Sequence, residues 1–323
     1  MGHLSGAGGE APGSDRGAGG PAEDPARVPT RSGFIALAGR PNVGKSTLAN
    51  ALVGAKIAIV SDKPQTTRRA IRGIATGEDW QLVLVDLPGV QRPRDALTER
   101  MQRRVERELE DADACLLVLN AEEGVGPGDR FIARLLESAP VPVLVALNKL
   151  DRVQRSSAAA ALQAAADLEV AEEILPVSAR TGEGVSALRD ALVSLLPRGP
   201  FYFEREALSD QTEQLRIAEL VREQALARTR EEVPHAVEVQ IESIEPNPSR
   251  ADLIRIGGVL LVETESQKGI LIGAGGSMIR SIGTAARRAI ERELGTRVHL
   301  ALRVRVRRHW RADEQLLDRL GIE

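Results

Sequence analysis

The sequence has one cysteine, few aromatic residues and no long apolar run, and each of these scarcities excludes a class of protein. The single Cys115 rules out an internal disulfide framework, and its apolar surroundings, ACLLVLNA, are typical of a core residue. Aromatic residues make up only 2% of the 323 residues, so a function based on aromatic stacking has few residues to use. No apolar run approaches the roughly 20 residues that a membrane-spanning helix needs. The N-terminus also lacks the apolar core of a signal peptide, so we expect a cytoplasmic protein.

Charge is unevenly distributed along the chain. The formal net charge is only −3, which alone argues against a nucleic-acid-binding protein. Between Lys268 and Arg311, however, the sequence contains eleven Lys and Arg residues and only two Glu, a local net charge of +9. Segregated positive charge of this kind indicates a surface that binds a polyanion.

The first two thirds of the chain alternate short apolar runs with helix-compatible stretches. Residues 1–31 are rich in Gly, Ala and Pro and predict a disordered tail. From residue 32 to residue 198, apolar runs such as FIALAG, QLVLVD and VPVLVALN are separated by segments such as TERMQRRVERELEDA. Strands alternating with helices indicate an α/β domain whose mostly parallel sheet is covered by helices on both faces. A Pro- and Gly-rich stretch then predicts a linker over residues 199–207.

The rest of the chain has a different order of elements. Residues 208–311 predict a helix, two strands, a glycine-rich loop, a second helix over about 277–294 and a third strand, which together form an α+β domain. In this prediction the glycine-rich loop lies between a strand and a helix. Residues 312–323 predict a short C-terminal helix.

The segment GRPNVGKS, residues 39–46, matches the phosphate-binding pattern G-x-x-x-x-G-K-[ST] between an apolar strand and a helix-compatible run. Backbone N–H groups of residues 42–46 would hold the α- and β-phosphates at a helix N-terminus. Lys45 would reach the β- and γ-phosphates, and Ser46 would bind Mg²⁺. This part of the predicted nucleotide site comprises Gly39, Arg40, Pro41, Asn42, Val43, Gly44, Lys45, Ser46 and Thr47.

Three further motifs follow in the order expected of a guanine-nucleotide site. DLPG, residues 86–89, would place Asp86 near Mg²⁺ and the Gly89 N–H near the γ-phosphate. In NKLD, residues 148–151, the Asp151 carboxylate can accept both the N1–H and the amino group of guanine, a donor pair that adenine lacks. SAR would offer a backbone N–H to the guanine oxygen. These motifs add Asp86, Leu87, Pro88, Gly89, Asn148, Lys149, Asp151, Ser178, Ala179 and Arg180 to a site for GTP or GDP.

The interval between residues 55 and 74 predicts a nucleotide-dependent switch. In GTPases this interval carries a threonine that closes onto Mg²⁺ when GTP is bound. Thr66 and Thr67 are both candidates, exposed loop threonines being the alternative, and we favour Thr67. The expected metal ligands are therefore Ser46, Thr67 and Asp86, and the expected catalytic residues are Lys45, Thr67 and Gly89.

Two residues bear on the rate of hydrolysis. Val90 follows DLPG, where Ras-type GTPases place a water-orienting Gln. Because valine cannot orient water, we expect slow intrinsic turnover, or turnover assisted by another group, ion or partner. Asn42 is a candidate for holding K⁺ beside the phosphates.

The second glycine-rich segment, GAGGSM, fits G-x-x-G over residues 273–276 and fits neither a dinucleotide-binding nor a P-loop pattern. A G-x-x-G loop leading into a helix is typical of KH domains, in which it grips about four nucleotides of RNA backbone. In LRVRVRR, arginines alternate with apolar residues and share one strand face, which would extend the phosphate-binding surface; a solvated edge strand is the alternative. Trp310 is a candidate for base stacking or for the core. The predicted RNA-binding residues are Lys268, Ile272, Gly273, Ala274, Gly275, Gly276, Ser277, Ile279, Arg280, Arg303, Arg305 and Arg307.

These motifs in this order resemble the Era family of bacterial GTPases over about residues 33–323. GRPNVGKS, DLPG, NKLD and SAR resemble its G domain, and GILIGAGGSMIRSIG with LRVRVRRHWRADEQLLDRLG resembles its C-terminal KH domain. The resemblance implies a P-loop GTPase domain followed by a type II KH domain. It also implies binding near the 3′ end of small-subunit ribosomal RNA, a role in assembling the small ribosomal subunit, and loose association with the inner face of the cell membrane. We expect a monomer.

Two departures from the family pattern affect these expectations. Leu87 stands where the family usually has Thr. Ala274 stands where many KH loops carry a basic residue, so RNA affinity would depend more on Lys268, Arg280 and the arginine strand. Two other hypotheses remain. One is a GTPase that regulates a protein or membrane partner through a docking domain; the other is an RNA chaperone with an inactive nucleotide site, against which the intact phosphate-loop lysine argues.

Overall fold

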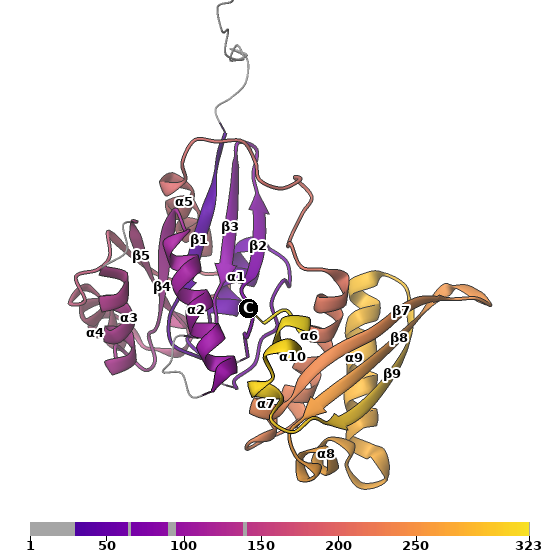
Figure 1. The fold of residues 1–323 in the computed structure, drawn as a ribbon. Helices are drawn as coiled ribbons and strands as arrows, with labels where there is room; N and C mark the ends of the chain where they lie inside the picture. The colour runs from indigo at the N-terminus through magenta and orange to yellow at the C-terminus, as the bar shows by residue number, and fades with distance from the viewer. Residues whose placement is uncertain (1–29, 64–65, 90–94, 138–140, 323) are drawn as a thin grey trace, which may run out of the picture.

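A computed structural model describes residues 30–63, 66–89, 95–137 and 141–322. Figure 1 shows an N-terminal domain and a C-terminal domain that lie against each other and are joined by one long connection. Within the described ranges, no helix is both long enough and apolar enough to cross a membrane.

The N-terminal domain is built on a six-stranded sheet with the order β2-β3-β1-β4-β5-β6. The pairs β1–β3, β1–β4, β4–β5 and β5–β6 are parallel, and β2 pairs with β3 in the antiparallel sense. The prediction of a mostly parallel sheet is therefore confirmed. Its strands are β1 (Arg31–Ala38), β2 (Ile71–Thr76), β3 (Trp80–Asp86), β4 (Ala114–Asn120), β5 (Val143–Asn148) and β6 (Glu173–Pro176).

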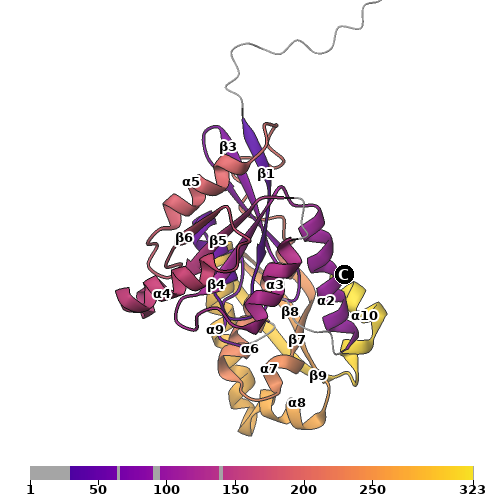
Figure 2. The ribbon, with the colours of Figure 1, turned by 90° about the vertical axis from the view of Figure 1, so that its left-hand side faces the viewer.

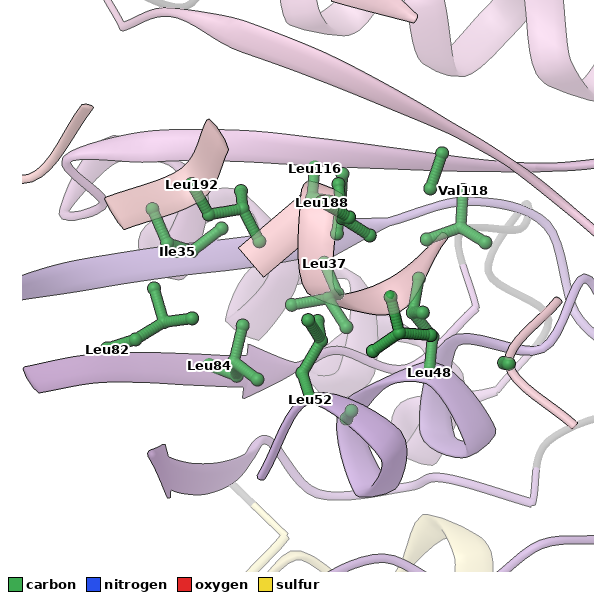
Figure 3. Close-up of a cluster of buried hydrophobic side chains, with 14 of the residues drawn as sticks. Ile35, Leu37, Leu48, Leu52, Leu82, Leu84, Leu116, Val118, Leu188 and Leu192 are labelled. Atoms are coloured by element: carbon green, nitrogen blue, oxygen red, sulfur yellow. The ribbon is translucent and has the colours of Figure 1, made fainter. Parts of the chain in front are cut away.

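Helices cover both faces of this sheet because the parallel strands are apolar on both faces. On β1, Ile35 and Leu37 pack with α1 and α5, as Figure 3 shows, while Ala36 and Ala38 pack on the opposite face with α2, α3 and α4. Cys115 of β4 is fully buried, and burial raises the pKa of its thiol to about 12, as expected of a core residue. The helices are α1 (Lys45–Val53), α2 (Ala96–Glu110), α3 (Pro127–Glu137), α4 (Arg155–Ala166) and α5 (Val185–Leu195), with a short 3₁₀ helix η1 (Leu150–Arg152).

The carboxyl ends of the parallel strands meet at one edge of the sheet. The strands β1, β3, β5 and β6 lead there into the GRPNVGKS, DLPG, NKLD and SAR segments, respectively. Ligands of open α/β sheets bind outside this edge, so the topology alone brings the four predicted motifs together.

The C-terminal domain has a three-stranded sheet with the order β7-β8-β9, in which β7–β8 is antiparallel and β8–β9 is parallel. Its core lies between one face of this sheet and the helices α6 and α9. The elements are α6 (Glu213–Arg228), α7 (Val233–Ala236), β7 (Glu238–Asn247), β8 (Arg250–Val262), α8 (Glu265–Ile272), η2 (Ala274–Gly276), α9 (Ser277–Leu294), β9 (Arg297–Val306), η3 (Trp310–Ala312) and α10 (Glu314–Arg319).

One element of this domain contradicts the prediction. The glycine-rich loop was expected to follow a strand, but helix α8 precedes it, so the loop connects two helices. The helix begins at a capping box in which the Thr264 hydroxyl accepts the Gln267 N–H while the Gln267 side chain accepts the Thr264 N–H. The apolar run GILI is too short to distinguish a strand from a helix by periodicity, whereas the capping box specifies a helix.

The C-terminal segment lies between the two domains, and Figures 1 and 2 both show α10 beside α2. Arg100 of α2 pairs with Glu314 and, at 2.5 Å, with Asp318 of α10. The face of β8 that is turned away from α9 contributes Val259 and Leu261 to an apolar cluster at this junction. The other fully or largely buried members are Leu97, Met101, Trp310, Leu316, Leu317, Leu320 and Ile322.

The connection between the domains is fastened to the N-terminal domain. The buried Gln81 side chain accepts the N–H groups of Tyr202 and Phe203, both at 2.9 Å, and donates to the Phe203 carbonyl at 2.9 Å. The Ile74 N–H donates to the Leu208 carbonyl at the edge of the sheet. The predicted linker is thus an ordered segment that is hydrogen-bonded to the N-terminal domain beside β2 and β3.

Candidate functional site

The phosphate-binding loop joins β1 to α1 in a conformation that presents backbone N–H groups. Asn42 and Gly44 have positive φ angles of 66° and 102°, and α1 begins at Lys45. A Cβ at Gly44 would lie 2.3 Å from the Asn148 side-chain nitrogen, so only glycine fits there. The N-terminus of a helix preceded by such a turn is suited to bind phosphate.

The Lys45 side chain is buried inside this loop. Its ammonium group donates to the carbonyls of Gly39 at 2.9 Å and Arg40 at 3.1 Å. Burial lowers the pKa of Lys45 to about 8, although the nearby Asp86 carboxylate opposes this shift. A bound phosphate would supply the negative charge that this buried ammonium lacks.

Three oxygen-bearing side chains from separate segments converge next to Lys45. The Ser46 hydroxyl donates to Asp86 Oδ2 at 2.6 Å, and the Thr67 hydroxyl lies 3.1 Å from Ser46 Oγ and 3.4 Å from Asp86 Oδ2. Thr66 instead donates to the Lys63 carbonyl. The structure therefore places Thr67, rather than Thr66, beside the other two predicted metal ligands.

This oxygen cluster fits a hard divalent cation. Asp86 Oδ1 is buried and has no hydrogen-bond partner among the described residues. Burial raises the pKa of Asp86, while Lys45, Ser46 and Thr67 oppose the shift. A cation bound here would satisfy the orphaned oxygen and stabilise the carboxylate, and hydroxyl and carboxylate oxygens are ligands that Mg²⁺ prefers. In the same described ranges, no group of three His, Cys, Asp or Glu side chains could hold a metal ion.

At the other end of the site, Asn148 connects the loops. Its Nδ2 donates to the Val43 carbonyl at 2.9 Å, and its Oδ1 accepts the Ala179 N–H at 3.0 Å. The Lys149 ammonium donates to the Asn42 carbonyl at 2.7 Å. The structure therefore places Asn148 as the predicted brace, between the phosphate-binding loop and the SAR loop.

Asp151 lies in the 3₁₀ helix η1, directly after Lys149 and Leu150. Asp151 Oδ1 accepts the Ser178 hydroxyl at 2.7 Å, and Oδ2 lies 2.9 Å from the Arg180 guanidinium without forming an aligned hydrogen bond. The Ser178 hydrogen bond is the main reason that the pKa of Asp151 lies below its usual range. The group is therefore an ionised acceptor, and two adjacent guanine donors would have to replace the contacts that its oxygens make with Ser178 and Arg180.

The remaining predicted residues take several positions. The Arg40 side chain pairs with Asp129 at 2.8 Å and with Glu123 at 3.0 Å, so its contribution to the loop is its backbone. Leu87 is fully buried, which agrees with a backbone role for this position. Val90 lies outside the described residues. Pro41, Thr47 and Gly89 line the pocket over the loop, together with Asn42, Gly44, Lys45, Ser46 and Thr67.

The structure adds a wall to this pocket that the motifs did not indicate. The wall residues are Ile59, Val60, Ser61 and Lys63, which line the pocket together with Thr66 and Thr67, and Val60 remains 44% exposed. Asn42 Nδ2 donates to the Asp62 carbonyl at 2.8 Å and so joins this wall to the phosphate-binding loop. The sequence signal that could have indicated this wall is Val60, an apolar residue that directly follows the run AKIAI.

In the second domain, the glycine-rich loop leads into α9, which forms one side of a groove. Gly273, Gly275 and Gly276 have positive φ angles of 70°, 58° and 77°, which lets the chain turn sharply between α8 and α9. Ala274 and Ser277 are exposed, and the Arg280 guanidinium donates to the Gly275 carbonyl. The groove lies between α9 and β9 and is lined by Ile279, Arg280, Gly283, Thr284, Arg287, Leu300 and Leu302.

The arginines of β9 lie on the other face of the sheet from this groove. Leu300, Leu302, Val304 and Val306 pack toward the core that contains α9, so the alternating arginines point to the opposite face. Acidic groups accompany them: Arg303 and Arg305 pair with Glu242, and Arg307 pairs with Asp313. The structure therefore separates the predicted RNA-binding residues: Ile279 and Arg280 line the groove, Lys268 and Ile272 belong to α8, and the strand arginines lie on the opposite face of the sheet.

Trp310 belongs to the core. Its side chain is fully buried, its indole N–H donates to the Ala236 carbonyl at 2.8 Å, and the Arg68 guanidinium lies 5.5 Å from its ring centroid. The prediction that it could stack on a base is wrong, because its ring is enclosed at the junction of the two domains.

The fold and its two loops define a P-loop guanine-nucleotide-binding protein with an appended KH domain. Residues 34–149 match the family described as 50S ribosome-binding GTPase, and residues 232–311 match the KH domain family. The chain is 48% identical to GTPase Era of Mycobacterium tuberculosis strain H37Rv over 294 residues, which is 90% of this chain and 98% of that protein. The chain belongs to the Era family of GTPases and is accordingly a GTP-hydrolysing enzyme.

Two solved structures support the same assignment. A Tyr→Ala variant of Aquifex aeolicus Era bound to GDP and AlF₄⁻ superimposes with a TM-score of 0.88 at 33% identity, covering 91% of this chain and 99% of that one. Era in complex with MgGDPNP and nucleotides 1506–1542 of 16S ribosomal RNA superimposes with a TM-score of 0.87 at 34% identity and the same coverage.

Proposed function

We propose that this protein is a GTP-driven switch that binds the 3′ region of small-subunit ribosomal RNA and assists assembly of the small ribosomal subunit. The observation that carries the proposal is the combination, in one chain, of the Ser46–Thr67–Asp86 oxygen cluster with a glycine-rich loop and groove. The related Era structure that holds both MgGDPNP and a 16S ribosomal RNA fragment supports it.

In the nucleotide site, the phosphate-loop N–H groups and Lys45 bind the β- and γ-phosphates. Mg²⁺ would neutralise phosphate charge, held by Ser46, Thr67 and Asp86. Asp151 accepts the two guanine donors. The Ser178 N–H donates to Glu183 and the Ala179 N–H to Asn148, so the contact to the guanine oxygen requires a shift at Ala179 or comes from Arg180.

Turnover is expected to be slow because Val90 supplies no water-orienting group. K⁺ is a candidate cofactor beside the phosphates. Asn42 supports this proposal because it lies in the phosphate-binding loop and its Nδ2 is bonded to the Asp62 carbonyl, which orients its side-chain oxygen. A K⁺-dependent increase in the GTP hydrolysis rate, absent in Asn42→Ala, is the expected result; equal rates in Na⁺ and K⁺ would contradict it.

RNA binding is assigned to the groove between α9 and β9. The groove has apolar walls for bases and Arg280 and Arg287 at its side, and the glycine loop that precedes α9 has a backbone that can approach phosphates. We assign the protein to the cytoplasm as a monomer, with peripheral association with the inner face of the cell membrane.

Binding of a short RNA copying the 3′ end of small-subunit ribosomal RNA tests the RNA assignment. We expect tighter binding than to a scrambled RNA and a loss of affinity in Ala274→Asp, which places a negative charge in the exposed loop. Ala159→Asp, on an exposed position of α4, is the matched control. Equal affinity for both RNAs, or equal affinity of the two variants, would favour a protein-docking role for the second domain.

A further inference from the structure

The two residues that follow Thr67 insert their side chains into the second domain. Arg68 is almost completely buried, and its guanidinium donates to the Val237 carbonyl at 2.7 Å, to Glu238 Oε2 at 2.8 Å and to the His235 carbonyl at 2.8 Å. The sequence places these arginines in the nucleotide-dependent switch, but the structure surrounds them with the KH domain.

Arg69 is held in the same way. Its guanidinium donates to Glu219 Oε1 at 2.8 Å, to Glu238 Oε1 at 3.2 Å and to the Leu320 carbonyl at 2.7 Å. Glu238, the first residue of β7, is fully buried. It bridges both arginines, because each of its carboxylate oxygens accepts a hydrogen bond from one of them. Although burial opposes ionisation of Glu238, the pKa of its carboxyl lies far below its usual range because Arg69, Arg222 and Arg68 surround it.

Arg68 and Arg69, which contact the second domain, directly follow Thr67 of the metal-ligand cluster in the sequence. Neighbouring Cα atoms are about 3.8 Å apart, so a shift of Arg68 by a few ångströms would move Thr67 as well. The Thr67 hydroxyl lies 3.1 Å from Ser46 Oγ and is largely buried. The position of Thr67 therefore depends on the contacts that the next two residues, Arg68 and Arg69, make with the other domain.

Stability alone is a weak explanation for this arrangement. Buried ion pairs often contribute little net stability, because the loss of hydration offsets the attraction between the charges. The cluster also gathers three buried arginines, Arg68, Arg69 and Arg222, around two buried carboxylates, Glu219 and Glu238. Such a set is better suited to fixing the positions of these side chains relative to one another than to stabilising the contact between the two domains.

We infer that Glu238 is a positioning residue of the GTP site: it holds Arg68 and Arg69 and thereby keeps Thr67 where Mg²⁺ binds. This inference rests on the proposed role of Thr67 as a Mg²⁺ ligand. By thermodynamic linkage, a nucleotide that draws Thr67 onto the metal must favour the docked KH domain to the same extent. GTP, whose Mg²⁺ uses Thr67, and GDP, whose Mg²⁺ does not, would then differ in their effect on the second domain.

The test measures the affinities of the full-length chain for GDP and for a non-hydrolysable GTP analogue, both with Mg²⁺. For Glu238→Gln we expect roughly tenfold weaker binding of the analogue and a GDP affinity within about twofold of the parent, a factor of ten being about 1.4 kcal/mol. The control is Lys56→Gln, which removes an exposed interdomain ion pair with Glu223 at 2.6 Å and should change neither affinity. A folded Glu238→Gln protein in which both affinities change equally, or neither changes, would overturn the inference.

Two further variants keep the result interpretable. Arg69→Lys retains the charge but cannot reach both carboxylates, so it should lower analogue affinity in the same direction even where Glu238→Gln fails to fold. Thr67→Ala tests the underlying site: an unchanged ratio of the two affinities would refute the Mg²⁺ assignment and the inference with it. A changed ratio in Thr67→Ala, with an unchanged ratio in Glu238→Gln and Arg69→Lys, would refute the positioning role alone.

Discussion

Replacing Asp151 with Asn tests how the site selects guanine. In the structure, Asp151 Oδ1 accepts the Ser178 hydroxyl at 2.7 Å while Oδ2 has no aligned hydrogen bond among the described residues. An asparagine keeps the shape of the side chain and its bond to Ser178. It replaces one carboxylate oxygen with an NH₂ group, which would face the donors of guanine instead of accepting from them.

The magnitude follows from the hydrogen bond that is lost. A hydrogen bond to a charged group contributes about 1.5–3 kcal/mol, and the asparagine loses one of the two acceptors, so GTP binding should weaken by about 1.5–3 kcal/mol. This corresponds to a loss of roughly 10–10² in affinity. Xanthine carries a carbonyl oxygen where guanine carries its amino group, so the new amide should donate to it, and XTP should bind the variant better than GTP.

This preference is measured by letting GTP or XTP displace a fluorescently labelled nucleotide from its complex with the protein. Asp190→Asn, an exposed position on α5, is the matched control and should retain the preference for GTP. An Asp151→Asn protein that still prefers GTP as strongly as the parent would refute the guanine contact.

Three other predictions concern the phosphate loop and the domain junction. Lys45→Ala should abolish nucleotide binding or turnover without unfolding the chain; unchanged GTPase activity with a native circular dichroism spectrum would exclude the assigned site. Because burial lowers the pKa of Lys45 to about 8 and a bound phosphate would raise it, binding takes up a proton above that pH. GDP affinity should fall by about twofold between pH 7 and 8 and then by up to roughly tenfold per pH unit, whereas a flat profile to pH 9 would contradict this. Trp310→Ala should lower the free energy of unfolding by about 3–5 kcal/mol, because the ring is fully buried. Chemical denaturation measures this, and a loss below 1 kcal/mol would contradict the packing.

The nucleotide site could be predicted largely from the sequence. Its motifs are contiguous, and each follows an apolar strand, so the topology of a parallel sheet brings them to one edge. The choice of Thr67 over Thr66 also agrees with the structure, in which only Thr67 of the two lies beside Ser46 and Asp86.

Other features depend on partners far away in the chain. Nothing local in TTRRAIR indicates that Arg68 and Arg69 are buried, because their carboxylate partners lie about 150 residues or more further along. The alternation in β9 shows which side chains share a face, but only the position of α9 shows that this face is turned away from the groove. The apolar run within α8 does not predict a helix, because so short a run fits either type of element; the local signal that specifies the helix is the capping box at Thr264.

The affinity of the full-length protein for the 3′-end RNA, measured with GDP and with a non-hydrolysable GTP analogue, tests the central claim most directly. If the metal-ligand cluster is connected to the KH domain through Arg68 and Arg69, the GTP-analogue form and the GDP form should bind this RNA with different affinities. We predict tighter, sequence-dependent binding in the GTP-analogue form. Equal affinities in the two nucleotide states would contradict the claim that one chain combines these sites as a switch.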